Sequence, residues 1–322
     1  MSFGLALMAG AVDAAVGYPN ILYRAIGHPV TWMGRFITWA DEQWNSEQDP
    51  PDQRRLHGVL LVVALLILSL LSGLAIAWLC RAALPPLLAF IAIAILASSL
   101  VAQRSLYEHV EAVADALGHG LAQGREAVAM IVGRDTSELD EAGVCRAAIE
   151  SLAESFCDGI VAPLFWLALA GLPGGIACKA INTADSMIGH KTDRYIDFGW
   201  AAARTDDAVN WPAARLAVLW LALGAFLVPR ASPGQALAVA WRDAGKHDSP
   251  NAGWPEAAMA GALGLRLVGP SSYEGEIVQK GWMGDGRSGL KAADIRTALD
   301  LYRAACGVQL GLLAILLGFT FL

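Results

Sequence analysis

The chain has 322 residues, of which 56% are hydrophobic and only 16% are charged, whereas ordinary soluble domains carry about 25% charged residues. Its mean hydropathy of +0.46 is typical of a membrane protein. A formal net charge of -7 argues against a nucleic-acid partner, because such partners are bound by basic surfaces. The five scattered cysteines lack metal or redox spacing, which predicts reduced thiols and neither a disulfide framework nor a zinc site.

Apolar segments of the length that crosses a bilayer, about 20 residues, recur along the chain. The stretch up to Tyr23 carries one charge, Asp13, and lacks the basic start of a cleaved signal peptide, so we expect a first span there. Uncharged runs follow at 58–79 and 82–102. We therefore predict an all-α, polytopic helical membrane protein with about four to six spans, forming a single integral-membrane domain over residues 1–322. The remaining predicted spans are a short one at 216–228 and a terminal one at 305–322.

Polar connections separate these spans and carry the motifs. Residues 103–157 alternate charged and apolar positions at helical spacing, which predicts amphipathic helices. Few β-branched alternating runs occur, so we expect no substantial sheet. The four polar connections lie at 18–57, 103–158, 178–212 and 230–303.

The stretch ESLAESFCDGIVAPLFW, residues 150–166, places three acids at the start of an uncharged run. Glu150, Glu154 and Asp158 are four residues apart and would share one stripe of a helix, where like charges repel. Carboxylates held close together need a cation or raise one another's pKa. We expect the three acids to face a polar cavity shared with Asp185, not bulk solvent.

Proline and glycine interrupt the run 159–178, most densely in GLPGG at 171–175. Broken helices at membrane depth are tolerated mainly where they line protein or a water-filled cavity. Two topologies stay open: a simple crossing, and a re-entrant pair of half-helices that returns the chain to the same side. We favour the re-entrant form on functional grounds, because it keeps the charged blocks before and after the run together.

The next block, residues 179–216, is dense in Asn, Asp, Lys and Arg. Asn182 and Asp185 are three residues apart and would share a helix face, and Asp193 follows them. A solvated, salt-bridged loop is one interpretation. The other is phosphate handling, because Mg²⁺ is bound through one or two carboxylates together with substrate phosphates. No P-loop motif is present, so a nucleotide would have to bind in another way.

A third block, WRDAGKHDSPNAGWPE, precedes the alanine-rich helix that we expect from Glu256 onward. A helix N-terminus offers free backbone N–H groups to an anion, with Asn251 or Gly253 as a cap and three basic side chains just upstream. The alternative is a tight turn before a packed helix. Arg35 follows an apolar Trp/Met stretch, and an Arg near the membrane is usually paired with an anion. The three upstream basic residues are Arg242, Lys246 and His247.

Together these blocks, in this order and between these spans, resemble the CobD/CbiB family of cobalamin-biosynthesis membrane proteins, the adenosylcobinamide-phosphate synthases. The stretches that carry the resemblance are HPVTWMGR, ESLAESFCDGIVAPLFW, NTADSMIGHKTDRYIDFGW with DDAVNWPAARL, and KHDSPNAGWPEAAMAGALG. The resemblance runs nearly end to end. It implies ATP-dependent amide formation between the free propionate of adenosylcobyric acid, a corrinoid, and (R)-1-aminopropan-2-ol phosphate. It also implies Mg²⁺, the bacterial cytoplasmic membrane, and association with other membrane enzymes of cobalamin assembly.

With this resemblance we assign site roles as expectations. The expected catalytic group is Glu150, Glu154, Asp158, Asp185 and Lys191, and the expected Mg²⁺ ligands are Glu154, Asp185 and Asp193. Asp206 and Asp207 are second choices, which could instead serve Arg204 and Arg215 structurally. The expected substrate contacts are Arg35, Asn182, His190, Arg242, Lys246, His247 and Asn251.

Two other functions stay open. A membrane prenyl- or alcohol-phosphate transferase also joins apolar helices to Asp-rich Mg²⁺ motifs, although its acids are paired more tightly than Asn182, Asp185 and Asp193 are. A transporter or regulatory membrane protein without catalysis would also use broken helices with buried acids. Acids inside the spans would favour transport, whereas most of the acids here lie in the connections.

Overall fold

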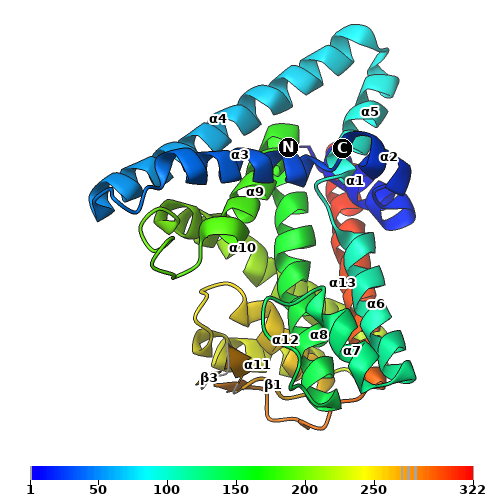
Figure 1. Cartoon of the computed structure of the whole chain (residues 1–322). Coiled ribbons are helices and arrows are strands. Elements are labelled where there is room, and N and C mark those ends of the chain that lie inside the picture. The colour runs from blue at the N-terminus through cyan, green and yellow to red at the C-terminus, as the bar shows by residue number, and fades with distance from the viewer. Residues whose placement is uncertain (1, 270, 274–275, 279–280, 322) are drawn as a thin grey trace. The chain divides into compact units, whose positions relative to one another are not determined.

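A computed structural model describes residues 2–269, 271–273, 276–278 and 281–321, and helices dominate it (Figure 1). Contacts divide the chain into two compact units. Unit 1 comprises residues 1–102, 162–210 and 313–322, and unit 2 comprises residues 103–161 and 211–312.

Unit 1 is built from the N-terminal helices and from the helices that follow residue 162. Proline occupies the first turn of α3, α4 and α5, where its missing N–H costs no helical hydrogen bond. Pro85 and Pro86 also end α4, because the residue before a proline avoids helical dihedrals. The helices are α1 Phe3–Val16, α2 Asn20–Ile26, α3 Pro29–Trp44, α4 Pro51–Ala83, α5 Pro86–Ser98, α9 Ala162–Ile188 and the first part of α10 Trp200–Gly224.

Unit 2 holds the amphipathic helices predicted for the 103–157 region, together with the later part of α10. Two short antiparallel ribbons pair β1 with β4 and β2 with β3. Its elements are α6 Gln103–His119, α7 Leu121–Ala129, α8 Glu141–Phe156, the π-helical turn η1 Cys157–Val161, the 3-10 turns η2 Ala225–Leu227 and η3 Ala244–Lys246, α11 Pro233–Asp243, α12 Gly253–Leu263, β1 Leu267–Val268, β2 Ser271–Tyr273, β3 Glu276–Val278 and β4 Trp282–Met283. Helix α13 Ala292–Phe319 belongs to unit 2 up to residue 312, and its last turns belong to unit 1.

Among the described residues, five helices are long and apolar enough to cross a membrane, or six if the bent pair at the N-terminus counts as one span. This confirms the all-α polytopic class and the predicted number of spans. The short span predicted at 216–228 is part of a longer helix, because α10 begins at Trp200. The five candidates are 51–83, 86–119, 141–188, 200–227 and 292–319.

The predicted interruption of the 159–178 run lies at Gly171, whose φ of 66° and ψ of -156° are not helical. Beyond it the chain turns back on itself. A Cβ on Gly174 would lie 2.6 Å from the carbonyl oxygen of Trp166, and one on Gly175 would lie 2.6 Å from Leu167. Residues eight apart in a straight helix are separated by about 12 Å. Helix α9 is therefore a hairpin of two arms, and the predicted interruption is confirmed. The side of the membrane to which the second arm leads stays a prediction.

The outer face of this hairpin packs on α4. A Cβ added to Gly73 of α4 would lie 2.6 Å from the Cα of Pro173, so only glycine allows the two backbones to approach this closely. Further along the second arm, Ile181, Ala184 and Ile188 recur at helical spacing and are buried in the core formed with α3, α4 and the start of α10. This core sets the rotation of the arm.

Candidate functional site

The second arm of α9 and the start of α10 bring four polar side chains together in unit 1. With Ile181 and Ile188 facing the core, Asn182 and Asp185 take the adjoining face of the arm and are half-buried. On α10, Asp206 is 8% exposed and Asn210 is 1% exposed. We call Asn182, Asp185, Asp206 and Asn210 the α9–α10 polar cluster.

The cluster is held together by hydrogen bonding to the Asp206 carboxylate and by electrostatic contacts. Asn210 Nδ2 donates to Asp206 Oδ2 at 2.9 Å. Asp185 and Asn182 both act on the Asp206 carboxylate. Within the described part of the chain, no donor meets Asp206 Oδ1 or Asn210 Oδ1 with hydrogen-bond geometry, although both atoms are buried. Buried acceptors are nearly always satisfied in proteins, so these two oxygens need a partner from outside the chain.

Charged groups of both signs border the cluster. Asp207 lies 3.9 Å from Arg204, and Lys191, which is exposed, acts on the same carboxylate. His190 is exposed, and its Nε2 lies 3.0 Å from the carbonyl oxygen of Ser186. The exposed lysine and histidine are therefore available to an incoming anion.

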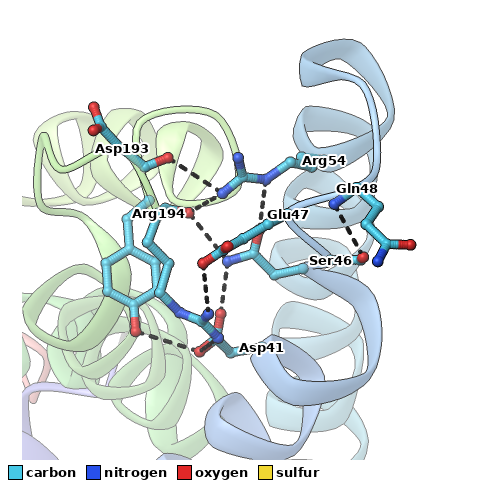
Figure 2. A network of polar contacts seen from close by, with 9 residues as sticks. Asp41, Ser46, Glu47, Gln48, Arg54, Asp193 and Arg194 are labelled. Atoms are coloured by element: carbon cyan, nitrogen blue, oxygen red, sulfur yellow. Dashed lines mark hydrogen bonds and ion pairs between the residues drawn. The ribbon is translucent and has the colours of Figure 1, made fainter.

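The loop between α9 and α10 is fastened by its main chain (Figure 2). Arg54 Nη2 donates to the carbonyl oxygens of Asp193 and Arg194, and Arg54 Nε donates to Asn45 at 2.8 Å. Asn45 also donates to the Arg194 carbonyl at 3.1 Å, while Asp41 accepts from the Arg194 guanidinium at 2.8 Å, which raises the pKa of that guanidinium. The Asp193 carboxylate points away from this network and is exposed (Figure 2). Its predicted metal role stays a prediction.

In unit 2 the three acids of the predicted stripe, Glu150, Glu154 and Asp158, differ in burial and in bonding. Glu150 accepts from Arg134 at 2.8 Å through Oε2 and from the Val268 N–H at 2.7 Å through Oε1. The side chains of Glu150 and Arg134 are only 12% and 11% exposed. Both carboxylate oxygens of Glu150 thus serve the fold, whereas Glu154 is exposed and Asp158 is half-buried in the π-helical turn.

Two of the predicted phosphate contacts, Arg242 and Lys246, lie around a buried acid. The Asp243 carboxylate is fully buried and accepts two hydrogen bonds from Arg242, at 2.8 and 2.6 Å. Lys246 Nζ lies 2.7 Å from it, and the Gly284 N–H donates to it at 2.9 Å. The Arg242 guanidinium, with help from Lys246, holds the pKa of Asp243 below its usual range. Arg242 also pairs with Asp285, so the charges of Arg242 and Lys246 are met by two carboxylates within the protein.

The predicted anion site before α12 is a closed turn in the structure. Ser249 Oγ accepts from the N–H groups of Asn251 and Ala252, which occupies donors that an anion would need. His247 Nδ1 accepts from the Ser249 N–H at 2.9 Å. Asn251 Oδ1 accepts from Arg215, whose guanidinium also lies 4.7 Å from the Trp254 ring centre. This geometry matches the packed-turn alternative.

Sequence reasoning ranked Asp206 second and missed Asn210. A usable signal was present in TDDAVNW, because Asp206 and Asn210 are four residues apart and share a helix face, just as Asn182 and Asp185 do. The predicted contact Arg35 is exposed on α3.

Comparison with known proteins places this geometry in context. The chain matches a family model described as CobD/Cbib protein over residues 6–302. Proteins named cobalamin biosynthesis protein CobD are similar to it throughout. The one from Rhodobacter capsulatus is 49% identical over 316 residues, and the match covers 96% of this chain and 96% of that protein. The one from Rhizobium meliloti is 47% identical over 308 residues, covering 94% of this chain and 93% of its own. No solved structure matches the chain.

Proposed function

This chain belongs to the CobD/CbiB family, whose members act in cobalamin biosynthesis, and on that premise we propose that it is an ATP- and Mg²⁺-dependent amide-forming ligase of the bacterial cytoplasmic membrane. The substrates are the free propionate of adenosylcobyric acid and the amine of (R)-1-aminopropan-2-ol phosphate. The product is adenosylcobinamide phosphate.

The chemistry needs an activated acid, because a carboxylate and an amine do not condense unaided in water. Phosphoryl transfer from ATP to the propionate would give an acyl phosphate and ADP. The amine would then attack the acyl carbon and release phosphate. Mg²⁺, when bound, neutralises phosphate charge in such transfers.

The α9–α10 polar cluster is the observation that supports this function best. Its buried oxygens suit a hard cation, and the exposed Lys191 and His190 nearby can hold phosphate oxygens. Arg35, Glu154 and Asp158 remain proposed contacts for the substrates and the attacking amine. Glu150, Arg242 and Lys246 are not carried into the mechanism, because their charged groups are engaged within the fold.

Membranes that contain the protein test the proposal directly. Given adenosylcobyric acid, aminopropanol phosphate and Mg·ATP, they should yield adenosylcobinamide phosphate, detected by mass spectrometry, together with ADP. Omitting ATP or replacing Asp185 by alanine should abolish the product, and parallel assays with ethanolamine phosphate would define the preferred amine. A natively folded sample that forms no amide with either amine would overturn the proposal and favour the non-catalytic alternative.

A further inference from the structure

We propose that the α9–α10 polar cluster is itself a divalent-cation site, in which Asp206 and Asn210 are ligands together with Asp185 and Asn182. Only the catalytic use of the cation rests on the proposed function, since binding can be measured without any substrate. The ligand set differs from the one predicted from the sequence, which contained Asp193 and Glu154 in place of Asp206, Asn182 and Asn210.

The first argument is the state of two buried oxygens. Asn210 is 1% exposed and Asp206 is 8% exposed, yet Asn210 Oδ1 and Asp206 Oδ1 meet no donor among the described residues. A buried polar atom without a partner costs about 1–3 kcal/mol, and more if it is charged. A single cation that binds both oxygens would remove the cost of both unsatisfied atoms.

The second argument is the sign of the surrounding charge. The side chains that act on the Asp206 carboxylate include Asp185, Asp207, Asn182 and Asn210, none of which carries a positive charge, and the basic group that acts on Asp185 is the exposed His190. Carboxylates that share a buried region either keep a proton or bind a cation. A cation satisfies the Asn210 oxygen as well, which a proton placed between two carboxylates does not.

The third argument concerns the type of cation. All four side chains offer oxygen, and none of them offers sulfur or imidazole nitrogen, so the site suits Mg²⁺ or Mn²⁺ rather than a softer metal. Among the described residues, no group of three His, Cys, Asp or Glu side chains has metal-binding geometry. Two carboxylates with two amides match Mg²⁺, which uses few carboxylates and keeps positions for water or phosphate.

Mn²⁺ alone is the probe for this site. Full-length protein purified in detergent is titrated with Mn²⁺, and free Mn²⁺ is followed by electron paramagnetic resonance, first alone and then with competing Mg²⁺. We expect one saturable site per chain that Mg²⁺ displaces. Asp206→Asn and Asn210→Leu should each weaken Mn²⁺ binding about tenfold or more.

Two further variants test the position of one ligand and provide a control. Gly189→Ala leaves every proposed ligand in place, but its Cβ would lie 1.9 Å from Asp185 Oδ1 and must displace that carboxylate, so Mn²⁺ binding should weaken here too. Asp193→Asn removes an exposed acid from the next loop and should leave the affinity unchanged. Thermal unfolding of each variant without metal shows whether it is folded.

The results separate this inference from the proposed function. Saturable binding that is lost in Asp206→Asn supports the site even if no amide product ever forms. Wild-type affinity in folded Asp206→Asn and Asn210→Leu variants overturns the site, even in an active enzyme. Binding that depends on Asp193 and not on Asp206 overturns it in favour of the ligand set predicted from the sequence.

Discussion

Replacing Glu150 by glutamine removes a charge from a nearly enclosed ion pair while keeping the shape of the side chain. Glu150 and Arg134 are 12% and 11% exposed, and breaking a buried pair costs about 3–5 kcal/mol. The slight exposure lets water reach the guanidinium, so we expect glutamine to lower the free energy of unfolding by about 2–4 kcal/mol. Alanine should cost about 1–3 kcal/mol more, because it also leaves the Val268 N–H without its acceptor.

The assay is denaturant unfolding in detergent, followed by tryptophan fluorescence, with product formation measured on the same samples. Arg134→Met should destabilise by a similar amount, and the double variant should lose less than the sum, because both changes break one interaction. Glu154→Gln, one turn further along α8 and exposed, should stay within about 0.5 kcal/mol of wild type. A Glu150→Gln protein with wild-type stability but no product would refute this reasoning and return Glu150 to the chemistry.

Three other predictions concern the fold and its pH dependence. Because the pKa of Asp243 is lowered in the folded chain, its carboxylate stabilises the protein above the unfolded value of about 4, and this contribution is lost as the pH falls through the folded value. Asp243→Asn should therefore cost about 2–3 kcal/mol at pH 7, a gap to wild type that shrinks in unfolding curves at pH 3; a gap independent of pH would contradict this. Gly171→Ala should cost about 1–2 kcal/mol for its φ of 66°, whereas Gly118→Ala, with open space around its Cβ, should be neutral or stabilising. Arg54→Met should remove the donor that holds two carbonyls of the α9–α10 loop, so the loop should open more often and its backbone N–H groups should exchange faster over residues 189–199; unchanged exchange would argue against the network in Figure 2.

Features set by local chemistry could be predicted from the sequence, and features set by distant partners could not. The GLPGG hairpin was predictable, because glycine and proline dictate backbone geometry wherever they lie. Asn182 and Asp185 were predictable as a pair, because their spacing fixes a shared helix face. The role of Glu150 was not predictable, because its partner Val268 lies 118 residues away.

The basic residues of the third block illustrate the same limit. Arg242 and Lys246 look like phosphate ligands in a linear reading, and Asp243 between them looks like an ordinary surface acid. Only packing shows that Asp243 is fully buried and pairs with both basic residues, while Asp285 provides a second acid for Arg242. Charge patterns therefore identified the polar regions but could not separate groups available to a substrate from groups already neutralised.

The fastening of the α9–α10 loop has a consequence for how the chain is made. Arg54 and the carbonyl of Arg194 that it binds are 140 residues apart in the sequence. At a synthesis rate of about 5–20 residues per second, roughly 7–28 s separate the emergence of the two from the ribosome. During that interval Arg54 can bind Asn45, which lies nine residues before it, but the Nη2 group that later binds the loop must stay hydrated. The segment that joins α3 to α4 is thus synthesised before the loop that it binds, and the loop can bind Arg54 only after residue 194 has been made.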